Sequence, residues 1–150
     1  MNDQKLTEHF SFYEMTTTTQ AELLEANREA ALQAVEKLRQ VCVELEKLRA
    51  FIMRPIIIKS GFRFPPLNSA VGGSTNSQHM AGEAADFSVA GSEHANALRF
   101  CFDWCCNHLV YGQIIFESPL HRKPWIHLGL PREGRPRTQL IFDGRTYLHT

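Results

Sequence analysis

Apolar residues recur at steps of three and four in the first third of the chain. The series consists of Val35, Leu38, Cys42, Leu45 and Leu48. Such spacing puts the side chains on one face of a helix. Ala, Leu, Glu, Lys and Arg, which favour helix formation, dominate residues 20–51. We therefore predict an amphipathic helical segment over residues 20–51, either continuous or interrupted near Asn27. It is too short to favour a coiled coil over packing on a sheet.

Residues on either side of this segment are typical of its ends. Residues 6–16 resemble an opening segment with a short helical turn, and the threonines at 16–19 form a break that can cap the next helix. Pro55 ends the helical segment.

After Pro55 the pattern changes to short runs of β-branched and aromatic residues, which predict strands. The predicted strands are residues 56–60, 84–89, 111–117, 125–130 and 138–142. We expect residues 56–60 to be a buried strand, followed by a loop that carries Pro65, Pro66, Gly72 and Gly73. Residues 92–109 look helical, with Ser92 as the cap. Helices followed by short strands indicate an α+β fold, with helices packed on a small, mostly antiparallel sheet.

A chain of 150 residues suits one domain, and no internal repeat or linker is evident. We expect a single domain over residues 1–150. Residues 1–53 would form its N-terminal helical part, and residues 54–150 would hold the sheet and any metal site.

The charge balance excludes one class of function. The chain carries 16 basic and 16 acidic residues and has a pI near 7.1, whereas nucleic-acid binders usually show a basic excess.

No apolar run is long enough to span a bilayer, so we expect no stable membrane association. Residues 1–5 are polar and lack an apolar signal core. We therefore expect the protein in the cytoplasm of the cell that makes it.

The four cysteines do not indicate a disulfide scaffold at this length. Cys101 and Cys105 lie one helical turn apart, Cys106 is adjacent, and the CxxC spacing of zinc sites is missing. We expect small buried side chains on a helix.

His79, Asp86 and His127 are the candidates for metal chemistry. Catalytic zinc usually takes three ligands from His, Asp, Glu or Cys. His79 and Asp86 are seven residues apart, and Gly82 between them allows a tight turn. In a strand, Asp86 faces away from Phe87, so the carboxylate can face a cleft while the ring enters the core. Alone, the spacing also fits a loop histidine and a paired aspartate.

A resemblance strengthens the metal hypothesis. The signature Ser77-x-His79-x-x-Gly82-x-Ala84-x-Asp86 resembles that of the zinc D-alanyl-D-alanine metallopeptidases, a family of DD-carboxypeptidases and phage cell-wall endopeptidases with a hedgehog-type fold. Further similar segments are Glu8-His9-Phe10, Ser60-Gly61-Phe62-Arg63, Pro66-Leu67-Asn68, Ala70-Val71-Gly72-Gly73-Ser74 and Trp125-Ile126-His127. The resemblance runs from about residue 6 to about residue 130.

The resemblance implies roles only at matching positions. His79, Asp86 and His127 match the ligands of one Zn²⁺ ion. Arg63 matches a group that binds the substrate carboxylate or carbonyl oxygen, and Ser77 matches a serine lining the site. An ordinary surface ion pair is the alternative for Arg63, and a loop cap that orients His79 is the alternative for Ser77.

The general base is not settled by the resemblance. Some relatives have a glutamate three residues before the last histidine and others a histidine two residues before it, but here Pro124 and Trp125 occupy those positions. If residue 115 opposes residue 127 in a hairpin, Glu117 lies diagonal to His127, within reach of a water molecule beside the metal. A register shift by one residue would turn it away. His121, in the turn, is the weaker candidate.

The resemblance implies a zinc peptidase that acts on peptidoglycan stem peptides, either a DD-carboxypeptidase or an endopeptidase that cuts inside the stem. We expect a monomeric, phage-type lytic enzyme that reaches the cell wall after release. The alternative is a non-catalytic zinc-containing binding or virion module of the same fold.

Overall fold

The computed structural model describes residues 2–150, and its N-terminal part is helical as predicted. Its helices are η1 (Glu14–Thr16), η2 (Ala21–Leu23), α1 (Leu24–Ala31), η3 (Leu32–Ala34) and α2 (Val35–Ile52). The interruption lies at η3 and not near Asn27, which is buried in the middle of α1. Asn27 stays within the helix because its side chain makes tertiary hydrogen bonds, described below. Met53, in the left-handed conformation (φ 53°), ends α2.

Six strands form one sheet in the order β1-β2-β4-β3-β5-β6. The strands are β1 (Ile56–Ser60), β2 (Ala84–Val89), β3 (Gln113–Glu117), β4 (Trp125–Gly129), β5 (Thr138–Phe142) and β6 (Tyr147–His149). All neighbours pair antiparallel except β3 and β5, which are parallel. The predicted α+β class with a mostly antiparallel sheet is confirmed.

The register of the β3–β4 hairpin decides which side chains share a face. Ile115 pairs with His127, as the site hypothesis required. Side chains alternate between the two faces along a strand. On one face of this hairpin, four apolar side chains are buried in the hydrophobic core, namely Ile114, Phe116, Ile126 and Leu128. Their neighbours along each strand face the opposite side of the sheet.

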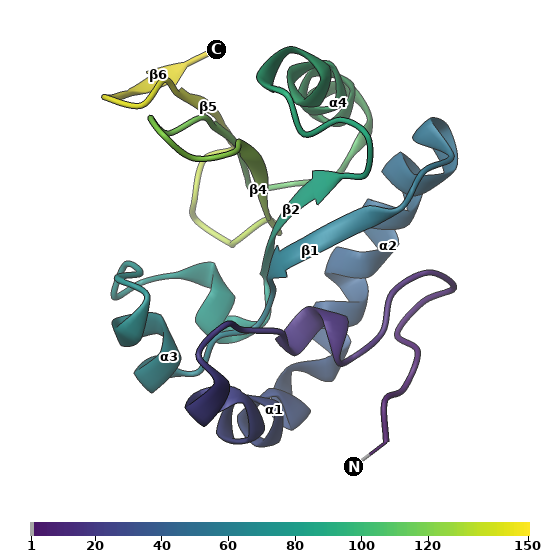
Figure 1. Cartoon of the computed structure of the whole chain (residues 1–150), viewed down its shortest axis with the longest axis vertical. Coiled ribbons are helices and arrows are strands. Elements are labelled where there is room, and N and C mark those ends of the chain that lie inside the picture. The colour runs from purple at the N-terminus through teal and green to yellow at the C-terminus, as the bar shows by residue number, and fades with distance from the viewer. Residues whose placement is uncertain (1) are drawn as a thin grey trace.

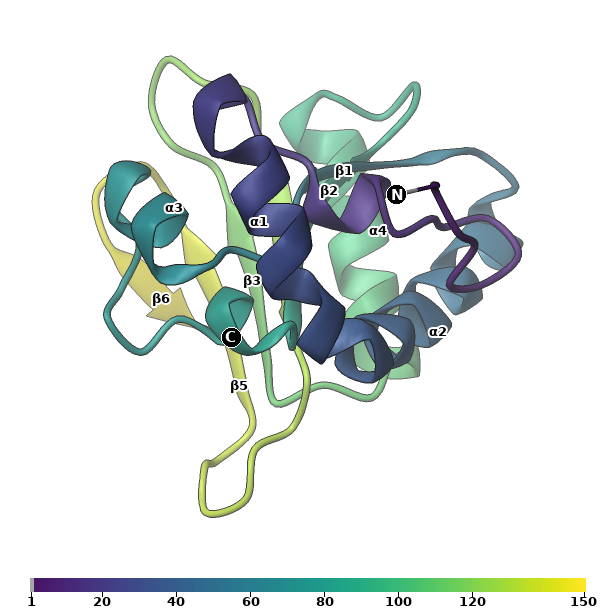
Figure 2. The same ribbon diagram turned by 90° about the horizontal axis from the view of Figure 1, so that it is seen from below.

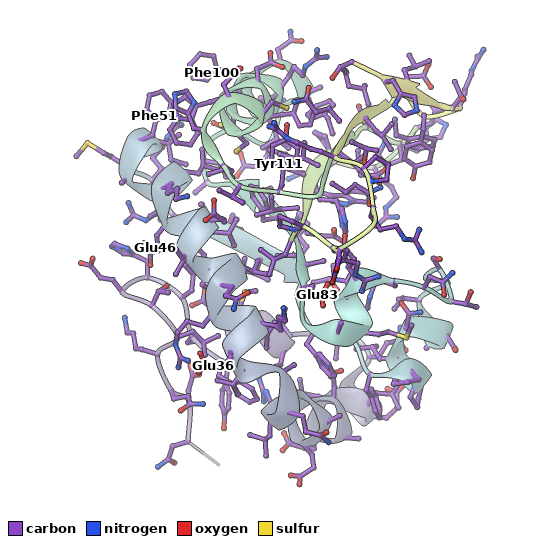
Figure 3. All side chains as sticks on the ribbon, turned by 180° about the vertical axis from the view of Figure 1, so that it is seen from behind. Glu36, Glu46, Phe51, Glu83, Phe100 and Tyr111 are labelled. Atoms are coloured by element: carbon purple, nitrogen blue, oxygen red, sulfur yellow. The ribbon has the colours of Figure 1, made fainter. Side chains whose placement is uncertain are left out.

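The core lies between the sheet and the helices α2 and α4 (Ala95–His108). Both helices pack on the sheet and on each other, and Figure 1 shows them on the side away from the short helix α3 (Pro65–Ala70). Figure 2 gives the same picture from below, with α3 and α4 on opposite sides of the strands. Phe51 and Phe100 lie close together at this back surface (Figure 3), with ring centroids 6.3 Å apart.

The structure corrects three local predictions. β1 is an edge strand and not a buried one: Ile56 is buried, whereas Ile57 is 42% exposed. A run of isoleucines hides this alternation. The predicted loop after β1 contains α3, which begins with Pro65 and Pro66, positions that favour a helix start.

The third correction concerns α4, which begins at Ala95 and not at Ser92. Ser92 is buried and its backbone N–H donates to Val89 in a tight turn at Gly91 (φ 77°), so it cannot cap the helix. β6 was not predicted at all, because all three of its residues are exposed and carry no apolar alternation.

All four cysteines are free thiols, and Cys42, Cys101 and Cys105 are buried as expected. Within residues 2–150, we find no helix that combines the length and apolarity needed to cross a membrane.

Candidate metal centre

His79 lies in a single short helical turn, η4 (Gln78–Ala81), opposite the core face of the sheet. The hydroxyl oxygen of Ser77 caps this turn by accepting the backbone N–H of His79 at 3.2 Å. Gly82 ends it in the left-handed conformation (φ 72°), and a Cβ there would lie 2.7 Å from the Cβ of Ala34. Gly82 is therefore required by both conformation and space.

The environment of the His79 ring fixes its tautomer. Nδ1 lies 2.6 Å from the carbonyl oxygen of Gly61, which can only accept a hydrogen bond, so Nδ1 carries the proton. In the neutral ring Nε2 then carries the lone pair. Nε2 is buried and makes no hydrogen bond with the described residues. A histidine held this way through a backbone carbonyl is oriented for metal binding.

Asp86 and His127 complete the cluster from the neighbouring strands β2 and β4. The two residues pair directly across the strands, and Asp86 Oδ1 lies 2.8 Å from His127 Nδ1 and 3.3 Å from His79 Nε2. One ligand atom from each residue lies within 4.8 Å of the other two. Two imidazoles and one carboxylate match the donor set of catalytic zinc sites, so the residues present fit such an ion.

Asp86 is ionised in this setting. Burial by itself raises the pKa of its carboxyl, but the electrostatic interaction with the facing His79 ring and the hydrogen bond from His127 outweigh burial and hold the pKa well below its usual range. The cluster therefore offers one anionic oxygen, which suits a divalent cation.

Arg63 reaches the cluster from the loop after β1. Its backbone N–H donates to the carbonyl of His79 at 3.0 Å, and its Nη2 donates to Ser77 Oγ at 3.3 Å. Its Nε is buried without a hydrogen-bond partner in the described chain. The surface ion pair considered for Arg63 is absent among residues 2–150. Ser77 both caps the turn and contacts Arg63.

Asn27 holds the Arg63 loop from α1. Its amide nitrogen donates to the carbonyls of Thr16 and Phe62 at 3.1 and 3.0 Å, and its amide oxygen accepts the N–H of Phe64 at 2.8 Å. The side chain thus bonds the backbone on both sides of Arg63. Sequence reasoning missed this role, because a buried asparagine inside a helical pattern resembles a helix interruption.

Glu117 lies at the end of β3 on the same face as His127. Only 9% of its surface is exposed, and the hydroxyl of Tyr147 donates to its two carboxylate oxygens at 3.2 and 3.4 Å. Burial raises its pKa, and the charge of Asp86 adds to this, although Tyr147 and His127 act in the opposite direction. A buried carboxylate with a raised pKa is suited to proton transfer.

A cleft of about 520 Å³ brings these residues together. Its lining includes all the predicted site residues, namely Arg63, Ser77, His79, Asp86, Glu117 and His127, and also Tyr147, which was not predicted. His121 is not part of this lining; it is exposed, with a left-handed backbone (φ 62°).

A family model described as Peptidase M15 matches residues 8–128. No curated protein gives a significant match to the chain. The matched region contains the cluster together with Arg63, Ser77 and Glu117, and it ends before β5 and β6. The chain belongs to the peptidase M15 family, the zinc D-Ala-D-Ala metallopeptidases, as its sequence signature predicted.

Proposed function

We propose that this chain is a zinc-dependent peptidase that hydrolyses peptide bonds in peptidoglycan stem peptides. The observation that carries the proposal is the cluster of His79, Asp86 and His127, in which the buried His79 Nε2 has a lone pair and no hydrogen-bond partner in the described chain. Membership of a metallopeptidase family supports it. Zinc held by these three side chains would polarise the scissile carbonyl and lower the pKa of a water molecule.

Glu117 takes the role of general base. It lies diagonal to His127 on the cleft face, because Ile115 opposes His127 in the hairpin. Diagonal neighbours are about 7–8 Å apart at the backbone, a distance that a glutamate side chain and one water molecule can bridge. The carboxylate accepts a proton from the attacking water and returns it to the leaving amine.

Arg63 takes the role of substrate binding. Its guanidinium lines the cleft beside Asp86. A guanidinium binds a substrate carboxylate or carbonyl oxygen with several parallel donors. Ser77 restrains both this guanidinium and the turn that carries His79.

Within this class, an internal cut is favoured over removal of a terminal residue. A second cavity of about 570 Å³ adjoins the cleft and shares Arg63, Val71, Asp86 and Trp125 with it. On the far side a cavity of about 270 Å³ shares Asn76, Gln78 and Gln113. Space for a peptide therefore continues past the cluster in both directions.

The proposal is tested with purified protein and isolated sacculi. We expect about one zinc per chain by elemental analysis, soluble peptide products by mass spectrometry, and loss of both after chelation. Product masses separate the two reactions, since a carboxypeptidase releases free D-alanine and an endopeptidase releases stem fragments. Zinc binding without any cleavage would instead support the non-catalytic binding module.

A further inference from the structure

The C-terminal hairpin β5–β6 brings a tyrosine to the candidate base. Glu117 pairs with Phe142 across β3 and β5, and Phe142 pairs with Tyr147 across β5 and β6. Residues in one row across a sheet point to the same face. Two strand spacings separate Glu117 from Tyr147, about 10 Å at the backbone, so only a long side chain can span the gap.

Phe142, which lies between Glu117 and Tyr147 in this row, packs against the tyrosine ring. Its ring lies 4.7 Å from the Tyr147 ring, centroid to centroid. The tyrosine crosses the phenylalanine and places its hydroxyl 3.2 and 3.4 Å from the two oxygens of Glu117. An ionised carboxylate can only accept, so the hydroxyl is the donor. Burial and the charge of Glu117 raise the pKa of Tyr147, which keeps this proton on the hydroxyl.

The hairpin turn is well fixed. The Asp143 carboxylate accepts the backbone N–H groups of Arg145 and Thr146 at 2.9 and 3.0 Å, and Gly144 supplies a positive φ of 94°. The backbone N–H of Ser118, next to Glu117, donates to the carbonyl of Phe142 at 3.0 Å. The turn and the end of β3 therefore hold Tyr147 in register with Glu117.

We propose that Tyr147 is a positioning residue for Glu117. Its hydroxyl holds the carboxylate in the orientation in which it accepts the proton of the attacking water, and Tyr147 keeps its own proton throughout. The hairpin lies beyond residue 128, where the family match ends, so this contact is an addition to the matched region. The inference rests on the proposed function.

The test is the variant Tyr147→Phe, which removes the hydroxyl and keeps the ring that stacks on Phe142. We expect kcat on a defined stem peptide to fall about tenfold, the effect of losing one hydrogen bond to a charged group. KM should change less than about twofold, because the bond matters in the transition state and not in substrate binding. Zinc content and melting temperature should match the wild type. Tyr13→Phe, a tyrosine outside the cleft lining, is the matched control.

A double variant separates positioning from direct action on the substrate. In a Glu117→Gln background, measured with enzyme in excess, Tyr147→Phe should have almost no further effect, because the hydroxyl acts through the carboxylate. An equal, tenfold loss in both backgrounds would show that the hydroxyl acts on the substrate itself, and would overturn the inference.

The wild-type rate in the same assay distinguishes failure of the proposed peptidase function from failure of the positioning role of Tyr147. If zinc-loaded wild type cleaves the peptide and Tyr147→Phe cleaves it equally fast, the positioning role is wrong and the proposed function stands. If the wild type cleaves nothing, the proposed function is wrong and the positioning role is wrong with it.

Discussion

His79 has little conformational freedom, because each of its polar atoms near the site has a defined partner or direction. Its N–H is capped by Ser77, its Nδ1 donates to Gly61, and its Nε2 faces Asp86. Gly61 tolerates no side chain, since a Cβ there would lie 2.2 Å from the Met15 carbonyl oxygen. The carbonyl that orients the ring thus belongs to a residue that packs directly against Met15 of η1.

Removing this ligand should abolish the metal's effect on stability. A ligand that binds only the folded state stabilises it by about 2.7 kcal/mol at one hundred times its Kd. We expect zinc to raise the melting temperature of the wild type and to leave that of His79→Ala unchanged. Differential scanning fluorimetry with added zinc or chelator measures both; an equal zinc response in the two proteins would remove His79 from the ligand set.

Glu117→Gln should separate metal binding from catalysis. Loss of a general base costs about 10²–10⁴ in rate, so we expect kcat to fall at least about a hundredfold with zinc content unchanged. Equal loss of zinc would show that Glu117 is a metal ligand and not the base.

The pH dependence of the reaction follows from the same residue. A base acts when deprotonated, and burial raises the pKa of Glu117. As the pH falls, kcat/KM should therefore decline at values above the ordinary glutamate range, which a pH–rate profile will show. An acid limb at or below the ordinary glutamate pKa would speak against Glu117 as the base.

At the scale of elements, α1 contributes to the site through one side chain. Asn27→Ala would leave the carbonyl of Phe62 and the N–H of Phe64 without their partner. Leaving a buried backbone group unsatisfied costs about 1–3 kcal/mol. We expect a loss of about 3 kcal/mol in urea denaturation and a lower kcat/KM, because Arg63 lies between these two groups. Unchanged stability would mean that the loop holds its shape without α1.

The strands with a clear alternation of apolar and polar residues were the ones that the sequence predicted best. The buried face of β3 and of β4 was predictable, because a shift by one residue would expose both apolar sets. The pairing of residue 115 with residue 127 was assumed as a condition, and the structure meets it. The exposure of β1 was not predictable, since consecutive isoleucines show no alternation. β6 could not be predicted, because a three-residue edge strand that is exposed shows no apolar periodicity. The role of Tyr147 could not be predicted either, because its hydrogen-bond partner Glu117 lies 30 residues away in the sequence.

In the whole molecule, the sheet has one face that forms the hydrophobic core and one face that forms the candidate site. One face packs against α2 and α4 to form the core, and the other faces the candidate metal ligands and the cleft. The α+β class was predictable from the hydrophobic pattern, whereas the three candidate ligands were recognised through the resemblance to a known family, because His79 lies in a turn and its spacing to Asp86 alone is not specific. The helices and turns that hold Arg63 and His79 depend on tertiary contacts and were not predictable.

The flanking cavities predict a preference for longer substrates. We expect a full stem peptide to be hydrolysed with a kcat/KM at least about tenfold above that of a blocked D-Ala-D-Ala dipeptide, because contacts remote from the scissile bond contribute to transition-state binding. Steady-state kinetics on the pair measures this. Faster cleavage of the dipeptide would indicate a carboxypeptidase.

The central claim is that His79, Asp86 and His127 bind a zinc ion that is required for peptide hydrolysis. The most direct test is mass spectrometry of the peptides released from purified sacculi by the protein as isolated, after chelation, and after zinc is restored. We expect peptide release by the protein as isolated, no release after chelation, and renewed release once zinc is restored. Release that continues undiminished in the zinc-free protein would contradict the claim.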